Sequence, residues 1–166
     1  MVAVRGGKRS PQSAVLAAST VTPPVSQARL QGRWNVHVKQ LRRLPGSRNG
    51  TDYWHVIPAC AAVVCHLVVH VKTGKYPFEL TMTRAGAVYR GHVTVGFIPC
   101  GRPPNSIPDP TVLTFRVHAT DAVGKGQEWV ATSFAGIVVG TSKYVSSAAF
   151  YCPASKFTAA LRGTPS

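Results

Sequence analysis

Four cysteines are the residues with the most definite chemistry in this chain of 166 residues. They stand at Cys60, Cys65, Cys100 and Cys152. The spacing Cys60-x4-Cys65 differs from the two-residue spacing typical of zinc ribbons, and no matching second pair follows it. An even number of cysteines in a small domain favours two disulfides and export to an oxidising compartment. Three pairings are possible. We favour Cys60–Cys65 across a tight turn and Cys100–Cys152 between distant strands, and the alternative is a cytosolic protein with four free thiols.

Six histidines raise the question of a metal site. His66 and His70 are four residues apart on an expected strand, so they share a face but lie ~13 Å apart. One ion cannot bind both side chains at that distance, so a site would need a histidine from another strand. The candidates are His37, His55, His92 and His118. Most of the histidines occupy the polar phase of their strands. We therefore predict exposed side chains, no metal and no cofactor.

The acidic residues are few, and their positions argue against catalysis. The five are Asp52, Glu79, Asp109, Asp121 and Glu128, all in or near expected turns or at exposed strand positions. Paired-carboxylate catalysis would need two of them to converge. No Gly-x-Ser-x-Gly motif is present to hold a nucleophilic serine, and Gly124-Lys125-Gly126 lacks the following helix that a phosphate loop requires. The sequence predicts a protein that is not an enzyme.

The charge balance is strongly basic, with 19 Lys and Arg against 5 Asp and Glu and a net charge of +14. A basic surface attracts phosphates, anionic lipids, anionic polymers and acidic proteins. The candidate basic patch consists of Lys39, Arg42, Arg43, Arg48, Lys72, Lys75, Arg84 and Arg90. Single-stranded nucleic acid would need exposed aromatic residues among these cations, whereas Trp34, Trp54 and Trp129 stand in the apolar phase. A generally basic exported protein without a specific polyanion partner is the first interpretation. The alternative partners are an anionic cell-envelope polymer or an acidic protein, and nucleic acid is not favoured.

The elements that must position these residues are strands. From Leu30 onward apolar and polar residues alternate, which is the pattern of strands with one buried face. Turn residues delimit about eight runs, near 31–44, 51–58, 64–72, 77–83, 87–97, 111–120, 127–139 and 156–163. Only Ser146 to Phe150 suggests a helical turn. The pattern predicts an all-β fold of about eight antiparallel strands, in a small barrel or a sandwich.

The chain divides into a leader and one domain. A basic stretch at 5–9 precedes a weakly apolar segment at 13–21, and small residues follow at 26–28. This order is typical of a secretory signal peptide, with a flexible Pro/Ser/Thr-rich leader as the alternative. We place the leader at 1–28 and a single β-domain at 29–166. No apolar run is long enough for a transmembrane helix.

Several short motifs recur at matching places in a known group of proteins. They are QGRWNV at 31–36, YWHVIPAC at 53–60 with Cys65 after it, YRGH at 89–92, PC at 99–100 and WVATSFAG at 129–136. Together they resemble a small secreted β-domain of actinobacteria, which is also the extracellular C-terminal part of some membrane Ser/Thr protein kinases. The resemblance covers residues 30–163 and implies a β-fold, two disulfides and an extracellular or cell-envelope location. It implies no ligand or reaction. The chain departs from the family at Val64, where the family has Gly, and in the Pro-rich loop at 101–110.

A second similarity concerns Gly32-Arg33-Trp34. This tripeptide is similar to the G-x-W motif of lipocalin and avidin-like barrels, where the Trp closes the barrel base. In lipocalins an arginine stacks over that Trp, and Arg162 would take this place here. We accordingly expect Trp34, Trp54, Trp129 and Arg162 in the barrel base or core. A calycin-like barrel would hold a small apolar ligand in a cavity lined by Trp34, Phe78, Leu80, Phe115 and Trp129.

Three functions therefore stay open. The leading hypothesis is a non-enzymatic, monomeric, secreted or cell-envelope domain that binds an anionic envelope component or a protein. The second is a calycin-like barrel that binds a small apolar ligand. The third is a nucleic-acid-binding β-barrel, whose affinity would fall steeply with salt.

Overall fold

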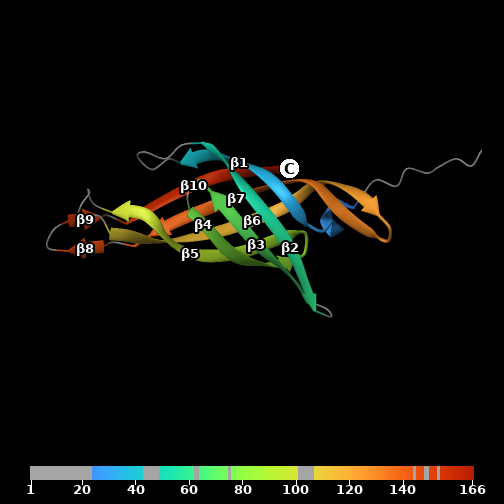
Figure 1. Ribbon diagram of the computed structural model, residues 1–166, viewed down its shortest axis with the longest axis horizontal. Helices are drawn as coiled ribbons and strands as arrows, with labels where there is room; N and C mark the ends of the chain where they lie inside the picture. The colour runs from blue at the N-terminus through green and yellow to red at the C-terminus, as the bar shows by residue number, and fades with distance from the viewer. Residues whose placement is uncertain are drawn as a thin grey trace, which may run out of the picture.

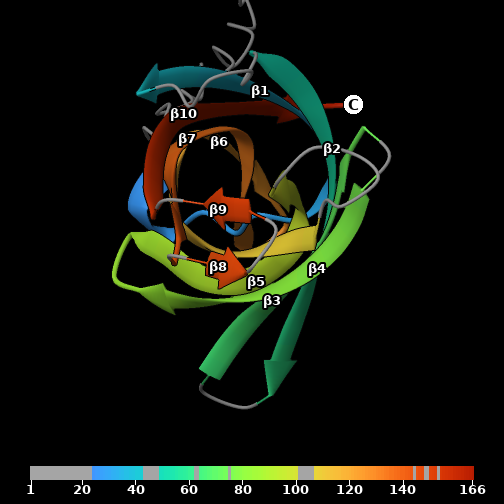
Figure 2. The same ribbon diagram turned by 90° about the vertical axis from the view of Figure 1, so that its left-hand side faces the viewer.

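Antiparallel strands make up nearly all of the described structure. The computed structural model describes residues 24–42, 49–61, 64–74, 76–100, 107–143, 145–147, 150–152 and 154–166. Eight strands form a closed barrel in the order β1-β10-β7-β6-β5-β4-β3-β2 (Figure 1, Figure 2). The all-β prediction is confirmed, and of the two architectures expected from the sequence the chain adopts the barrel. Within the described residues, no helix is long and apolar enough to cross a membrane.

The barrel is an up-and-down meander. Its strands are β1 (Gly32–Arg42), β2 (Gly50–Ala61), β3 (Val64–Thr73), β4 (Tyr76–Ala85), β5 (Val88–Cys100), β6 (Ile107–Lys125), β7 (Glu128–Ser142) and β10 (Ser155–Pro165). Each of the eight expected runs overlaps one of these strands. Strands β1 to β7 pair with their neighbours in the chain, and β10 closes the sheet between β7 and β1. Closure leaves the barrel sheet no free edge.

The alternation in the sequence sets the register of the barrel. One interior row runs from Trp34 on β1 to Trp54 on β2, Val71 on β3 and Phe78 on β4. A shift of one residue in the pairing of any strand would turn its apolar side chains outward. Burial of these side chains therefore determines the register of the strands.

Aromatic side chains fill one end of the barrel. Trp34 is 1% exposed, and its ring centroid lies 5.1 Å from that of Phe134 in an edge-on contact. Trp54 is 3% exposed and lies 5.5 Å from Phe134. Trp129 is only half-buried and packs against this core from β7. Arg162 does not stack over Trp34, because it is exposed on the outward phase of β10, between the buried residues Leu161 and Gly163.

The segment before β1 covers this closed end. It contains a 3-10 turn, η1 (Val25–Gln27). Arg29 pairs with β7: its N–H donates to the carbonyl of Trp129 at 2.8 Å, and its carbonyl accepts from the N–H of Ala131 at 2.9 Å. Ala28 is 1% exposed. Residues 24–28, assigned to the leader from the sequence, therefore pack on the barrel, and residues 1–23 lie outside the described part.

An arginine on β4 anchors this segment. Arg84 donates hydrogen bonds to the carbonyls of Ser26, Gln27 and Gly86. Its guanidinium lies 5.4 Å from the centroid of the Tyr89 ring, within the range of a cation–π contact. Arg84 therefore holds the closed end together and is not part of a free basic surface.

A small second sheet lies beyond the opposite end. It consists of β8 (Val145–Ser147) and β9 (Phe150–Cys152). Figure 1 places the pair past the ends of the barrel strands, and Figure 2 shows it in front of the barrel opening. The helical turn expected at 146–150 is wrong, since Val145 pairs with Cys152 and Ser147 with Phe150 in an antiparallel register. β-branched and aromatic residues favour this extended pairing.

The cysteines fall at the ends of strands. The register of β2 and β3 places Cys60 opposite Cys65. Directly opposed residues in antiparallel strands have Cα atoms ~4.5–5.5 Å apart, which suits a disulfide. The cysteine side chains lie outside the described part of the structure, so both disulfide pairings stay predictions.

Candidate functional site

The barrel interior holds a cavity of about 220 Å³ at the end opposite the aromatic cluster. Seven apolar side chains line it: Val38, Phe78, Leu113, Phe115, Val138, Phe157 and Leu161. An eight-stranded barrel has an interior just wide enough for side chains to fill. The two indoles and Phe134 fill it at the closed end, whereas at this level smaller residues such as Val38 and Val138 leave space.

Three polar side chains enter this apolar cavity from neighbouring strands. They are Gln40 on β1, Asp52 on β2 and Thr73 on β3. The Asp52 carboxyl is hydrogen-bonded to the Thr73 side chain. The Oε1 atom of Gln40 is buried and has no hydrogen-bond partner among the described residues. Buried acceptors without a partner are costly and uncommon. A ligand would therefore bind to Gln40 Oε1 and to the acceptor sites of the Asp52 carboxyl that Thr73 does not occupy.

The environment of Asp52 changes its acidity. Burial raises the pKa of the Asp52 carboxyl above its ordinary value, because an apolar surrounding disfavours the charged form. The hydrogen bond from Thr73 acts in the opposite direction but is the smaller effect. The other inward hydroxyls near this end are satisfied: Ser142 Oγ and Ser155 Oγ are 2.7 Å apart, and Thr111 also has a partner.

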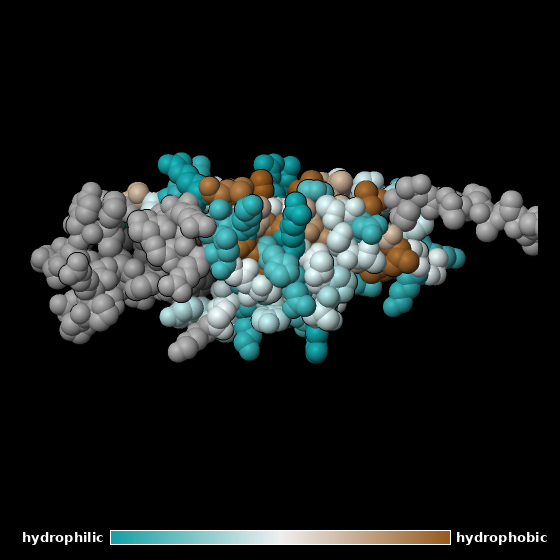
Figure 3. Space-filling model, turned by 90° about the horizontal axis from the view of Figure 1, so that it is seen from above, coloured by the Kyte–Doolittle hydropathy of each residue, from teal (hydrophilic) through white to brown (hydrophobic). Residues whose placement is uncertain are grey.

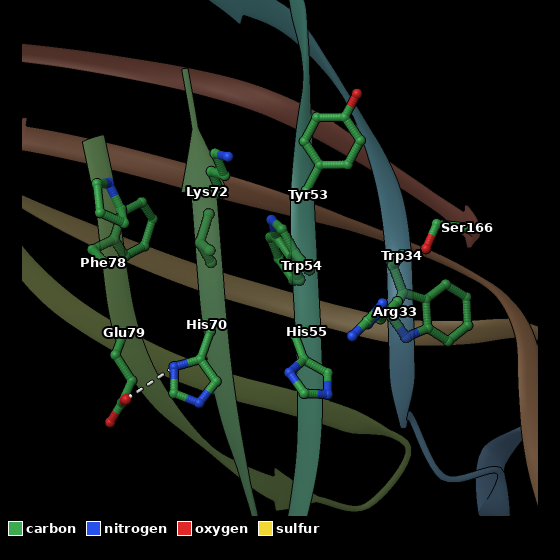
Figure 4. A pocket seen from close by; sticks show the side chains of 12 residues that line it. Arg33, Trp34, Tyr53, Trp54, His55, His70, Lys72, Phe78, Glu79 and Ser166 are labelled. Carbon is green, nitrogen blue, oxygen red and sulfur yellow. Dashed lines mark ion pairs between the residues drawn. The ribbon is translucent and has the colours of Figure 1, made fainter. Parts of the chain in front are cut away.

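A second hollow lies on the outside of the barrel, over β1 to β4. This outer groove has a volume of about 510 Å³. One side is formed by Arg33, His55, His70 and Glu79, which are successive partners across the four strands. The other side is formed by Tyr53, Lys72 and Pro77, and Ser166 also lines the groove. Figure 4 shows the two imidazoles side by side, with Lys72 and Tyr53 farther along the same strands.

The charges of the outer groove are mostly positive. The carboxylate of Glu79 lies 3.1 Å from His70 Nδ1, and the ring centroids of His55 and His70 are 6.1 Å apart. Arg33 and Lys72 form no ion pair within the described residues. The groove therefore offers cationic and imidazole groups to an anionic ligand. In the described part of the chain, no three His, Cys, Asp or Glu side chains cluster closely enough to hold a metal ion.

The described members of the candidate basic patch lie on several strands. Lys39 and Arg42 are exposed on β1, Lys72 on β3 and Arg90 on β5, while Arg84 is engaged at the closed end. Arg43, Arg48 and Lys75 lie outside the described residues. Figure 3 likewise shows hydrophilic side chains scattered over the described surface on one face of the barrel, without a single concentration. Alternation on a closed barrel distributes outward residues around the whole circumference.

One close pair of cations was not anticipated. Arg90 lies directly opposite Arg116 on β6, and directly opposed like charges destabilise a sheet. Neither arginine forms an ion pair with a described residue.

The expected cavity lining is partly wrong. Phe78 and Phe115 line the cavity as expected. Trp34 and Leu80 are instead packed in the core, and Trp129 lies at the closed end. Asp52, expected near a turn or at an exposed strand position, does lie near the start of β2 but is partly buried and lines the cavity. Extending the alternation of Trp54 and Val56 back by one step would have placed Asp52 inside the barrel.

Comparison with family models, curated proteins and solved structures finds no match to this chain.

Proposed function

We propose that this protein is a non-enzymatic binding protein whose barrel holds a small, mainly apolar ligand. The observation that carries the proposal is the cavity of about 220 Å³ with seven apolar side chains and a few converging polar groups. This composition is typical of small-molecule sites. An apolar cavity of roughly 150 Å³ holds benzene, so this one suits a single ring or a short chain.

Occupying the cavity with a larger side chain tests this function. Val138 lines the cavity and is 6% exposed, so Val138→Phe would place a ring in the ligand volume. We expect wild-type protein to bind 2-phenylethanol in calorimetric titrations and the variant to lose at least about tenfold in affinity. Ile137→Phe is the matched control, because Ile137 is 44% exposed on the outer face. Equal affinity in both variants and the wild type would contradict the proposal.

A second candidate function is binding of an anionic polymer at the outer groove. It is supported by Arg33 and Lys72, which flank the groove without ion-pair partners among the described residues. The net charge of +14 adds long-range attraction. Such a ligand fits an exported protein at the cell envelope, which is the location that we propose.

Salt dependence and substitution test the groove together. We expect inorganic polyphosphate to bind wild-type protein more weakly as NaCl rises, since salt screens exposed charges. Replacing Arg33 and Lys72 by Gln should weaken binding severalfold more than replacing Lys39 and Lys156, which are exposed elsewhere on the barrel. An equal effect of the two double variants would leave net charge as the only cause. The groove would then have no specific role.

A further inference from the structure

The unpartnered polar atom of the cavity is an acceptor, and the Asp52 carboxyl also accepts hydrogen bonds. Gln40 Oε1 is buried and unpartnered among the described residues. The Asp52 carboxyl has several acceptor sites, of which the hydroxyl of Thr73 occupies one. A ligand that brings donors would satisfy these oxygens, whereas a ligand that brings only acceptors would leave them unpaired.

The sign of the charge in the cavity is opposite to that of the whole protein. Of the described residues that line it, Asp52 is the only one with a titratable side chain, and no Lys, Arg or His is among them. The chain as a whole carries 19 Lys and Arg. Lys39 and Lys72, which are next in sequence to Gln40 and Thr73, are exposed on the outer phase of their strands. Asp52 is therefore the charged group that lines the cavity itself.

The apolar part of the cavity limits the rest of the ligand. The side chains of Phe78, Phe115 and Phe157 contribute three aromatic rings to its walls. Its volume of about 220 Å³ is below the ~300–1,000 Å³ of sites for drug-sized ligands. A single aromatic ring or a short alkyl chain fits this space and leaves its polar end near Asp52.

We infer that the ligand is a small primary amine with an aromatic or short aliphatic body, whose ammonium group is bound by Asp52. This inference rests on the proposed function of the cavity. The ammonium group donates to the Asp52 carboxylate, while the apolar body packs among the phenylalanines. Charge-assisted hydrogen bonds are roughly twice as strong as neutral ones, so the amine should be preferred over a neutral analogue.

Protonation of Asp52 opposes this binding. The ammonium group needs a carboxylate partner, and burial raises the pKa of that carboxyl. Affinity for the amine should therefore fall as the pH is lowered from 7 through the pKa of Asp52. Affinity for a neutral analogue should change little over the same range.

Three ligands of one shape test the inference: 2-phenylethylamine, 2-phenylethanol and phenylacetate. Calorimetric titration of the full chain at pH 7 should give at least about tenfold tighter binding of the amine than of the alcohol, and the weakest binding of the carboxylate. In Asp52→Asn the preference for the amine should disappear while the alcohol still binds, which also shows that the variant is folded. Glu128→Gln is the control with the same charge change, because Glu128 is paired with Arg29 at the closed end.

The outcomes separate the two proposals. If the amine and the alcohol bind equally, or the carboxylate binds most tightly, the amine inference is wrong and the cavity function stands. If none of the three binds to the wild-type protein, both are wrong. A preference for the amine that survives in Asp52→Asn also overturns the role of Asp52.

Discussion

Partial burial of the Asp52 carboxyl destabilises the folded barrel when this group is charged. This carboxyl has a folded-state pKa above the value of 3.8 that an unperturbed carboxyl has. The folded protein therefore binds this proton more tightly than the unfolded chain. The contribution of Asp52 to stability falls as pH rises from 3.8 through the folded-state pKa, and above that it stays unfavourable.

Asp52→Asn should therefore stabilise the ligand-free protein at pH 7. The amide keeps a similar shape and removes the penalty for burying a charge. Urea unfolding should give a higher midpoint for the variant at pH 7, with the advantage shrinking as pH is lowered toward 3.8. A variant less stable than wild type at pH 7 would show that the Thr73 contact outweighs burial.

Trp34 is one of the large buried side chains that fill the closed end. It is 1% exposed, contacts Phe134 and donates its indole N–H to the carbonyl of Gln31 at 3.0 Å. Trp34→Ala should lower the free energy of unfolding by roughly 3–5 kcal/mol, measured in urea, because it leaves a large cavity. Tyr53→Ala on the outer face, where Tyr53 is 57% exposed, should cost far less.

At the scale of elements, an inward glycine lets β4 and β5 approach closely. A Cβ added at Gly91 would lie 2.5 Å from the backbone oxygen of Thr81 and 2.9 Å from Met82 Cγ. Gly91→Ala should destabilise the protein by about 1–3 kcal/mol, since the backbone oxygen cannot rotate away. Gly50→Ala has nothing within 4 Å and should be neutral or slightly stabilising in the same urea assay.

The β2–β3 hairpin carries the test of the proposed export. Its register opposes Cys60 and Cys65, so we expect a disulfide between them in protein from an oxidising compartment, and a second one between Cys100 and Cys152. Peptide mapping without reduction should recover these two linked pairs. A link from either hairpin cysteine to Cys100 or Cys152 would contradict the pairing, and four free thiols would contradict export.

At the scale of the molecule, repulsion among the many positive charges destabilises the compact folded state. The net charge is +14 with histidines neutral, and the described residues contain one Arg–Glu ion pair, Arg29–Glu128, besides the contact of Glu79 with the His70 imidazole. Raising NaCl from about 10 to 150 mM shortens the screening length from ~30 to ~8 Å, which should weaken the repulsion. We expect Tm to rise by a few degrees. A falling Tm would mean that attractive pairs dominate.

The amino-acid sequence by itself determined the strands of this protein. Alternation over segments such as 34–38 and 113–117 is a local signal, because successive side chains of a strand point to opposite faces. It assigned the apolar phase to Trp34 and Trp54 and the polar phase to His70 and Lys72, as the structure has them.

Only the tertiary structure decided which of these residues meet. Closure between β1 and β10 joins segments far apart in the chain, and alternation alone does not distinguish a barrel from a sandwich. The size of the cavity depends on the summed volume of side chains from several strands, so no single segment of the sequence predicts it. Asp52 was expected near a turn or at an exposed strand position, where carboxyls are usually solvated, whereas the continuing strand turns it inward beside Thr73. Alternation along a strand shows on which side of the sheet a residue lies. Closure of the barrel determines which residues of other strands lie opposite it in the interior.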